Sequence, residues 1–330
     1  MEDKDLDVPF VSALLVTRNE QDYVEMAFLS LVEQDYPKDR YEIIVVDGGS
    51  TDETLLILKG LKKQYEGQEF SIRILDNPKH ILAAGWNMGI QAAKGEYVIR
   101  IDAHAKAEPS FLRTSVKTIQ QVDAVCVGGK LLTKTWKGND ETISKVLSSP
   151  FGVGNSSFRV SDKAGYVDTA VYGLYRKDIF EKVGYFSEKY VRNQDLQLHS
   201  RIRKAGGTFY FNPEIRCAYY TRNTTRKMLK QAFQNGRWNM VLMKEDCSGL
   251  SMRHLVPFVF VCFLVAIGGG GVFWNPLWGL GLSVIVLHLI LGVIFGWKGS
   301  ARGLELVKMP ILFFLLHTAY GAGYLAGLLH

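Results

Sequence analysis

Asp102-Ala103-His104 places a carboxylate and an imidazole two residues apart, directly after the apolar run Tyr97–Ile101. On an extended segment, residues i and i+2 point to the same side, so both side chains could reach one cation. A carboxylate with a neutral imidazole suits Mn²⁺, and Mg²⁺ also fits where phosphate oxygens complete its coordination. The tripeptide alone would equally fit an aspartate that caps a turn beside an unrelated histidine. Its position after a strand favours a metal site at Asp102 and His104.

Two more carboxylates flank a Gly-Gly turn after the apolar run Tyr41–Val46. Asp47 could accept hydrogen bonds from a nucleobase or from a ribose hydroxyl. Alternatively, Asp47 and Asp52 only shape the turn and cap the helix that follows. We favour ligand binding for Asp47 and the turn role for Asp52.

Asp195 follows Asn193 and Gln194 and precedes a helix expected over residues 196–205. An aspartate at this place is a common N-terminal helix cap. A rigidly held, partly exposed carboxylate also suits a general base that acts on a hydroxyl. The residues themselves leave both roles open.

Apolar runs over 10–16, 41–46, 71–75 and 97–101 alternate with helical patterns, notably over 53–65 and 83–93. This alternation predicts an α/β fold with a mostly parallel sheet covered on both faces. Ligands of such sheets bind beyond the carboxyl ends of the strands. The polar clusters at 17–20, 47–52 and 102–104 all fall there, so one crevice could collect them. Residues 131–170 are polar and irregular, which is typical of a mobile loop that orders around substrate.

The 330-residue chain carries a net charge of +6. Its four cysteines are scattered, which excludes a zinc ribbon and argues against a disulfide scaffold. Its last 76 residues are different in character, because residues 255–330 contain only four formal charges. Each of three apolar runs there reaches the roughly 18–20 residues that a membrane-crossing helix needs. We therefore expect transmembrane helices at Leu255–Phe273, Trp278–Phe295 and Met309–Leu329. A re-entrant hairpin or buried core helices remain the alternatives, because Gly268–Gly271 weakens a straight crossing.

Positive charges flank these runs on one side. Arg253 precedes the first run, and Lys298, Arg302 and Lys308 lie between the second and the third. By the positive-inside rule, the N-terminal domain and the loop 296–308 are expected to be cytoplasmic, with the protein integral to the cell membrane. The expected organisation is a domain over 1–220, an interfacial region over 221–254 and the membrane segment over 255–330.

The stretch Thr221–Lys244 interleaves basic residues with apolar and aromatic ones just before the first membrane run. Such a stretch is typical of a helix that lies on an anionic membrane surface. Nucleic-acid binding is the other use of this pattern, and the adjacent membrane helix argues against it.

Taken together, residues 8–245 resemble the inverting family-2 glycosyltransferases with the GT-A fold, a Rossmann-like domain with a mostly parallel sheet. The resemblance rests on ordered motifs: Val-Thr-Arg-Asn-Glu (16–20), Val-Val-Asp-Gly-Gly-Ser-Thr-Asp (45–52), Arg-Ile-Asp-Ala-His-Ala (100–105), Asn-Gln-Asp (193–195) and Gln234-x-x-Arg237-Trp238. The spelling of these motifs and the C-terminal membrane helices are most similar to the succinoglycan-type exopolysaccharide glycosyltransferases.

The resemblance implies a role for each matching position. Asp102 would contact the nucleotide sugar as well as the metal, and Asp195 would be the catalytic base. The residues implied to bind the nucleotide sugar are Thr17, Arg18, Glu20 and Asp47, and those implied near the acceptor or the diphosphate are Gln194, Gln234, Arg237 and Trp238.

The implied reaction is a single in-line displacement, in which Asp195 deprotonates the acceptor hydroxyl as it attacks the anomeric carbon. The donor would be a nucleotide sugar, by resemblance a UDP-sugar, used with Mn²⁺ or Mg²⁺. The acceptor would be a polyprenyl-diphosphate-linked saccharide or a glycolipid at the cytoplasmic face. Processive polysaccharide synthesis is the second reading, since Gln-x-x-Arg-Trp is similar to a motif of polymerising members. A non-catalytic scaffold with a degenerate fold is the third, and a homo-oligomer is compatible with each.

One position departs from the family's pattern. Many relatives carry an arginine near the third nucleotide-binding segment, where this chain reads Ala84-Gly85-Trp86-Asn87. We expect Lys130, after Gly128 and Gly129, to supply positive charge to the phosphates instead.

Overall fold

The computed structural model describes residues 8–67, 71–136, 141–221 and 224–329. The chain divides into two compact units. The first comprises Met1–Leu132 and Ser161–Tyr219, and the second comprises Thr133–Val160 and Tyr220–His330.

The first unit is built on a mixed sheet whose strand order is β3-β2-β1-β4-β8-β6-β9-β5, with β7 paired to β9. Its parallel half consists of β1 (Val11–Thr17), β2 (Tyr41–Asp47), β3 (Ser71–Asp76) and β4 (Tyr97–Asp102). The remaining strands pair antiparallel: β5 (Ala105–Ala107), β6 (Cys126–Lys134), β7 (Gly165–Val167), β8 (Leu174–Arg176) and β9 (Phe209–Tyr220).

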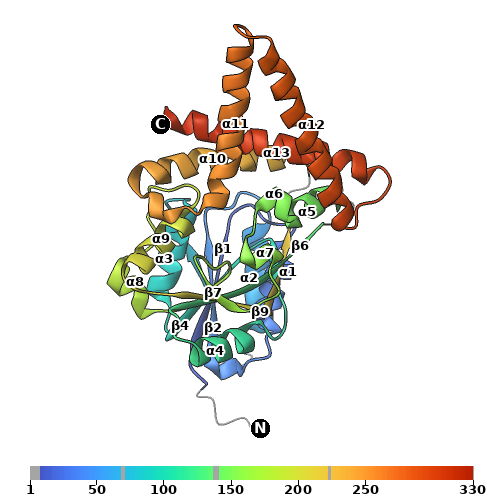
Figure 1. Ribbon diagram of the computed structural model, residues 1–330. Helices are drawn as coiled ribbons and strands as arrows, with labels where there is room; N and C mark the ends of the chain where they lie inside the picture. Colours follow the sequence, from blue (N-terminus) through green and yellow to red (C-terminus); the bar gives the residue numbers. More distant parts are fainter. Residues whose placement is uncertain (1–7, 68–70, 137–140, 222–223, 330) are drawn as a thin grey trace. The chain divides into compact units, whose positions relative to one another are not determined.

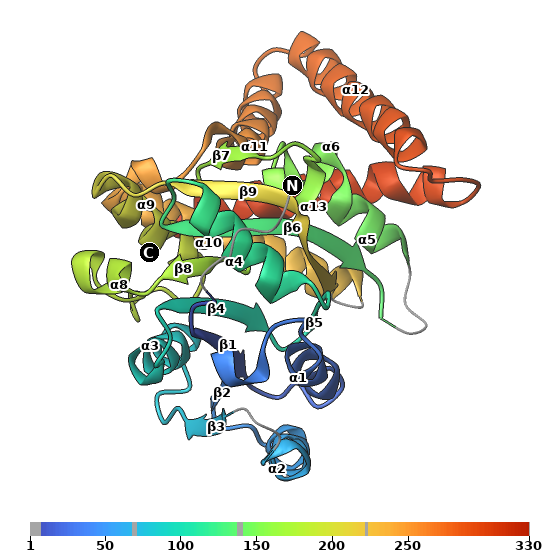
Figure 2. The same ribbon diagram turned by 90° about the horizontal axis from the view of Figure 1, so that it is seen from below.

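Helices cover both faces of the parallel strands. Figure 2 shows α3 on one side of β1 and β2 and α1 with α2 on the other. The helices of this unit are α1 (Val24–Val32), α2 (Thr54–Tyr65), α3 (Leu82–Ala92), α4 (Phe111–Gln121), α8 (Asp178–Val183) and α9 (Gln194–Lys204), with the 3₁₀ turn η1 (Lys38–Arg40). Because β1 and β2 are covered on both faces, every one of their residues is buried, as expected for central parallel strands. The predicted α/β architecture is confirmed.

The second unit is helical apart from its first residues. It comprises α5 (Glu141–Ser148), α6 (Pro150–Val153), α7 (Ser157–Val160), α10 (Thr225–Glu245), η2 (Cys247–Gly249), α11 (Met252–Gly271), α12 (Pro276–Lys298) and α13 (Glu305–Leu328). Within it, α11 and α12 form a hairpin, and α10 and α13 run side by side (Figure 1). Three of its helices, α11, α12 and α13, are long and apolar enough to cross a membrane.

The expectation of an irregular loop over 131–170 is wrong for much of that segment. Helices form from 141 to 148, 150 to 153 and 157 to 160. Ile143 and Val146 of α5 are buried in a cluster with Met309 and Phe313 of α13. The Lys145 ammonium also forms an ion pair with the Glu305 carboxylate, with an N–O distance of 2.7 Å. These contacts fold the segment onto the last helix, so it belongs to the helical unit.

Candidate active site

The carboxyl ends of β1, β2 and β4 meet at one edge of the sheet. In the strand register, Thr17 is opposite Asp47, and Val16 is opposite Asp102. The predicted convergence of the clusters at 17–20, 47–52 and 102–104 is therefore confirmed by the pairing of the strands.

The turn after β2 is held by its own polar groups. The Asp47 carboxylate accepts hydrogen bonds from the Ser50 amide at 2.9 Å and from the Ser50 hydroxyl at 2.5 Å. Across the turn, Arg18 Nη1 donates to the His80 carbonyl at 3.2 Å, and His80 Nδ1 lies 2.7 Å from the Gly48 carbonyl oxygen. Thr17 Oγ1 is buried and has no hydrogen-bond partner among the described residues. Thr17, Arg18 and Asp47 thus share a prearranged edge, and their role in nucleotide binding stays a prediction.

Asp52 joins two neighbouring loops, but its predicted role as the helix cap is wrong, because the N-cap of α2 is Glu53. Its carboxylate accepts from the Thr54 amide at 3.0 Å and from the Gln21 amide at 3.3 Å. These contacts lower the pKa of Asp52 despite the opposing effect of desolvation.

Asp102 and His104 lie on a tight turn that joins β4 to β5. The extended geometry expected for the tripeptide is wrong, because residues 103 and 104 form the turn. Tyr172 donates its hydroxyl hydrogen to Asp102 Oδ2 at 3.2 Å. His104 Nδ1 lies 3.4 Å from Glu20 Oε1. Burial and the charge of Asp102 raise the pKa of Tyr172, so its hydroxyl remains a donor at neutral pH.

These groups fit a divalent cation by the chemistry of their donors. His104 Nδ1 is buried without a hydrogen-bond partner among the described residues, although the Glu20 carboxylate lies beside it. The described residues contain no cluster of three or more His, Cys, Asp or Glu side chains suited to a metal. A cation at Asp102 and His104 would therefore need oxygen ligands from a bound molecule, as the diphosphate of a nucleotide would provide.

Asp195 lies in the first turn of α9. The cap position belongs to Asn193, which has a left-handed φ of 59°, so the alternative of Asp195 as the cap itself is wrong. Asp195 Oδ1 accepts from the Leu196 amide at 3.0 Å, and Asp195 Oδ2 lies 4.0 Å from Arg100 Nη2. Its side chain is one-third exposed, at 33%. The positive end of the helix dipole attracts the carboxylate. The carboxylate remains accessible to a substrate hydroxyl.

Arg100 is the residue of this site that the sequence reasoning missed. It lies in β4, two residues before Asp102, and is 8% exposed. Its guanidinium carbon lies 5.0 Å from the centre of the Trp86 ring and 5.5 Å from that of Phe186. Burial alone lowers the pKa of Arg100, but its acidic neighbours outweigh that effect and raise it. Arg100 is therefore a permanent cation beside Asp195.

Two guanidinium nitrogens of Arg100, Nε and Nη1, have no hydrogen-bond partner among the described residues. Buried unpaired donors are costly. Trp86, the departure from the family pattern, is fully buried and forms one wall of this arginine's surroundings. The sequence did contain one signal for Arg100, namely a charged residue inside the otherwise apolar strand 97–101.

His199, one turn after Asp195, fixes α9 to the sheet. Its Nδ1 lies 2.7 Å from Thr169 Oγ1, and its Nε2 lies 2.7 Å from Tyr175 Oη. Burial lowers the pKa of His199 to about 3. The imidazole is therefore neutral at pH 7, which keeps a second positive charge away from Arg100.

Two other predicted site residues of this unit, Lys130 and Gln194, lie among protein groups. Lys130 Nζ donates to the Ser161 carbonyl and to the Asp162 carboxylate, both at 2.8 Å. The Gln194 side-chain carbonyl is buried and has no partner among the described residues. Lys130 would have to leave Asp162 to reach a phosphate, and both assignments stay predictions.

The three residues of the Gln-x-x-Arg-Trp motif all lie on α10, in the second unit. Gln234 and Trp238 are four residues apart and share a face of the helix. That face differs from the buried row that includes Ala232, Gly236 and Met240. The motif is thus presented by a regular helix, and its contact with a substrate stays a prediction.

Comparison with known proteins agrees with this geometry. The model of "Glycosyl transferase family 2" matches residues 12–184, which include β1, β2, β4 and the Asp102–His104 turn. The chain belongs to glycosyl transferase family 2. The family and the GT-A fold inferred from the motifs are confirmed, and the protein is a glycosyltransferase.

Two relatives extend the similarity beyond the residues that the family model matches. A transferase of Methanococcus voltae is 30% identical over 326 residues, covering 97% of each chain; its name is dolichyl N-acetyl-alpha-D-glucosaminyl phosphate 3-beta-D-2,3-diacetamido-2,3-dideoxy-beta-D-glucuronosyltransferase. The succinoglycan biosynthesis protein ExoA of Rhizobium meliloti is 26% identical over 217 residues, covering 65% of this chain and 64% of the relative.

A solved structure supports the fold. The mannosyltransferase PcManGT from Pyrobaculum calidifontis, solved with GDP-Man and Mn²⁺, superposes with a TM-score of 0.63 at 16% identity, over 96% of this chain and 90% of the other. At this identity the likeness establishes the shared GT-A fold.

Proposed function

We propose that this glycosyltransferase moves a sugar from a nucleotide-sugar donor to a lipid-linked saccharide by one inverting displacement, with Asp195 as the base. The observation that carries the proposal is the closeness of Asp195 to β4. Asp195 Oδ2 lies 4.0 Å from Nη2 of Arg100, and Arg100 is only two residues before Asp102 on β4. A base and a diphosphate site thus belong to one small region, as a transfer between two bound molecules requires.

Each residue has a distinct task. Asp195 accepts the proton of the acceptor hydroxyl, and Arg100, at 4.0 Å, holds that carboxylate in orientation. The edge formed by Thr17, Arg18 and Asp47 binds the nucleotide. Asp102 and His104 would hold Mn²⁺ or Mg²⁺, and such an ion would supply stabilisation of the negative charge on the leaving diphosphate. General-base assistance of this kind is typically worth about 10²–10⁴-fold.

The membrane unit supports this acceptor class, and so does the relative in M. voltae, whose name specifies a dolichyl-phosphate-linked sugar. By the family resemblance alone, the proposed donor nucleotide is UDP. The test is an assay of radiolabelled nucleotide sugars with a polyprenyl-phosphate-linked sugar. Transfer to the lipid with an inverted anomeric centre supports the proposal, and its absence across UDP-, GDP- and dTDP-sugars contradicts it.

The placement in the cell membrane is also proposed. Helix α10 runs beside α13 in the same direction. A side chain at Gly236 would meet Tyr320, one at Gly327 would meet Met240, and Lys244 Nζ bonds the Leu328 carbonyl at 2.8 Å. If α13 crossed the hydrocarbon, the basic residues of α10 would cross with it, at about 2.5–3.5 kcal/mol for each central charge.

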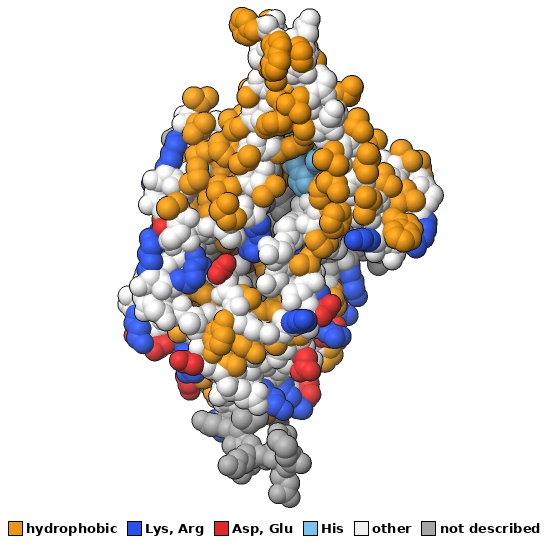
Figure 3. Space-filling view, viewed as in Figure 1, with side chains coloured by type: hydrophobic (Ala, Val, Ile, Leu, Met, Phe, Trp, Pro, Cys, Tyr) orange, Lys and Arg blue, Asp and Glu red, His pale blue; other side chains and the backbone are white. Residues whose placement is uncertain are grey.

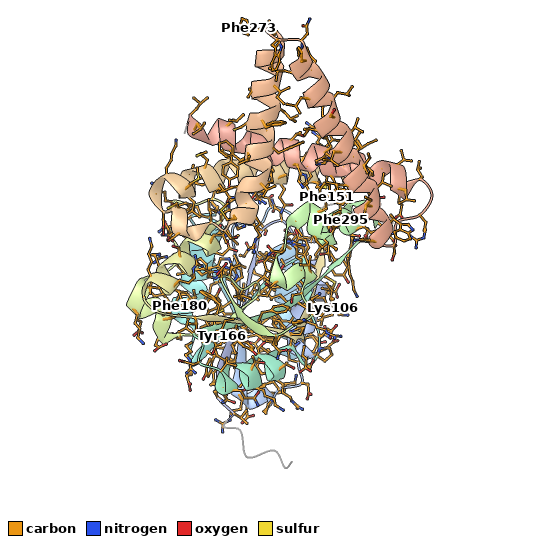
Figure 4. The ribbon with its side chains drawn as sticks, in the orientation of Figure 1. Lys106, Phe151, Tyr166, Phe180, Phe273 and Phe295 are labelled. Carbon is orange, nitrogen blue, oxygen red and sulfur yellow. The ribbon has the colours of Figure 1, made fainter. Side chains whose placement is uncertain are left out.

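We therefore place α13 with α10 along the cytoplasmic interface and propose that the α11–α12 hairpin enters the hydrocarbon as a re-entrant hairpin. A Cβ atom at Gly321 of α13 would meet Val261 of α11, and His317 of α13 lies 2.9 Å from His288 of α12. About ten residues of each helix extend beyond these contacts, and ten helical residues span about 15 Å, half of the hydrocarbon core. The exposed tip of the hairpin, with Phe273 (Figure 4), would therefore lie within the membrane.

Cysteine accessibility tests this arrangement in sealed, right-side-out vesicles. In a variant without native cysteines, Asn275→Cys, Arg302→Cys and Leu329→Cys should all fail to react with an impermeant maleimide, and Arg302→Cys should react once the vesicles are opened. Labelling of Asn275→Cys in sealed vesicles would contradict the re-entrant hairpin, and labelling of Leu329→Cys as well would mean that all three helices cross.

A further inference from the structure

Tyr172, just before β8, has an unusual backbone conformation. Its φ is 47°, in the left-handed region. A large aromatic residue rarely adopts this conformation, because its Cβ atom crowds a carbonyl oxygen. Such a residue persists only where the surrounding structure fixes it, and residues of this kind cluster at functional sites.

The pairing of β8 with β4 shows what this conformation changes. Leu174 is the last residue of β8 to pair with β4, opposite Ile99. If the antiparallel pairing continued, Tyr172 would lie opposite Ile101, and its side chain would be on the same face as that of Leu174. The left-handed residue breaks this alternation, so the Tyr172 side chain is free to turn toward the end of β4.

The chain on both sides of Tyr172 packs tightly against β6. A Cβ atom at Gly173 would lie 2.5 Å from Cys126 Sγ, and one at Gly128 would lie 2.8 Å from the Cβ atom of Ala170. Cys126 and Gly128 both belong to β6. This packing leaves the chain no room to move, and it holds Tyr172 in the left-handed conformation.

The hydroxyl of Tyr172 is directed at one group. Charged side chains are scattered over the surface of the first unit in Figure 3, but Tyr172 lies below that surface and is 3% exposed. Its hydroxyl donates to Asp102 Oδ2 at 3.2 Å. Packing alone does not explain the hydroxyl, because a phenylalanine would fill nearly the same volume without burying a polar atom. The contact with the Asp102 carboxylate does explain it.

A carboxylate that binds a cation has to present an oxygen in a fixed direction. Hydrogen bonds to metal-binding carboxylates commonly provide this orientation. We propose that Tyr172 is a positioning residue for a divalent cation at Asp102: its hydroxyl fixes Oδ2 and leaves Oδ1 to the cation. The inference rests on the proposed metal role of Asp102 and names the group that orients this ligand.

The experiment measures Mn²⁺ binding rather than sugar transfer. The full chain in detergent is titrated with Mn²⁺, alone and with UDP, and free Mn²⁺ is followed by its electron paramagnetic resonance signal. Tyr172→Phe keeps the ring and removes only the hydroxyl. We expect this variant to bind Mn²⁺ about 10- to 100-fold more weakly than the wild type, the usual effect of losing a hydrogen bond to a metal ligand.

Tyr175→Phe is the matched control. It also removes a buried hydroxyl from this part of the chain, but that hydroxyl lies 2.7 Å from His199 Nε2 and not beside Asp102. Tyr175 is 2% exposed, so the loss of either hydroxyl should lower the thermal midpoint by a similar small amount. Only Tyr172→Phe should weaken Mn²⁺ binding, whereas Tyr175→Phe should keep the wild-type affinity.

Three results would overturn the inference, and they differ from one another. Wild-type Mn²⁺ affinity in Tyr172→Phe would mean that the tyrosine has a structural role only. An equal loss of affinity in both variants would mean a general loosening around β8. A wild-type protein that binds no Mn²⁺, with or without UDP, would remove the metal role of Asp102 itself. Because no sugar transfer is measured, Mn²⁺ binding that depends on Tyr172 would stand even if the proposed acceptor were wrong.

Discussion

The two units of the protein achieve a fixed geometry by different means. In the first unit, backbone pairing sets the site: the register of β1 with β2 and β4 brings Thr17, Asp47 and Asp102 to one edge. In the second unit, glycines set the packing, because the lack of a Cβ atom lets two helices approach closely. A Cβ atom at Gly236 would lie 2.0 Å from the Tyr320 carbonyl oxygen, and one at Gly323 would lie 2.0 Å from that of Phe233. Strand register tolerates varied side chains, whereas close helix contact tolerates almost none.

The largest effect on stability is therefore expected at the contact between α10 and α13. Gly323→Val forces these helices apart and should destabilise the protein by about 3 kcal/mol. The thermal midpoint, followed by tryptophan fluorescence in detergent, should fall by several degrees. Gly269→Val on α11 is the matched control, since a Cβ there meets no atom within 4 Å. Equal losses in the two variants would contradict the contrast between the units.

In the first unit, Arg100→Gln should reduce kcat by about 10- to 100-fold, because the charge and contact that orient Asp195 are removed. Arg100→Lys keeps the charge and should restore part of the lost kcat. A purely structural arginine would lower stability in both variants and leave the kcat of the folded protein unchanged.

A smaller effect is expected from His199. Its pKa is about 3 in the folded protein, and about 6.5 in the unfolded chain. The unfolded state therefore binds a proton first as pH falls, and stability present above pH 6.5 is lost on acidification. Between pH 7 and pH 5 the loss from this group is about 2 kcal/mol. Denaturant unfolding of His199→Gln at both pH values should show a correspondingly shallower dependence, and an unchanged dependence would contradict the assignment.

The sequence predicted the edge of the sheet well because each strand ends in a polar cluster, and parallel strands end together. It could not reveal Arg100, since the partners that make this residue significant, Asp195 and Phe186, are more than 80 residues away along the chain. Their meeting depends on how α9 and the segment before it pack on β4.

The same limit explains the error over 131–170. Ile143, Val146 and Phe151 are too sparse to give a strong helical pattern by themselves. Their partners, Met309 and Phe313, lie about 160 residues later on α13. A helix that is stabilised mainly by tertiary packing has a weak local signal.

The most direct test of the account is Asp195→Asn, measured by turnover and by donor binding on the same preparation. Asparagine keeps the size of the side chain and cannot act as a general base. The account predicts a fall in kcat of about 10²–10⁴-fold, with the Kd of the nucleotide sugar nearly unchanged. Turnover within a few-fold of the wild type would contradict Asp195 as the base and, with it, the proposed reaction at the edge of the sheet.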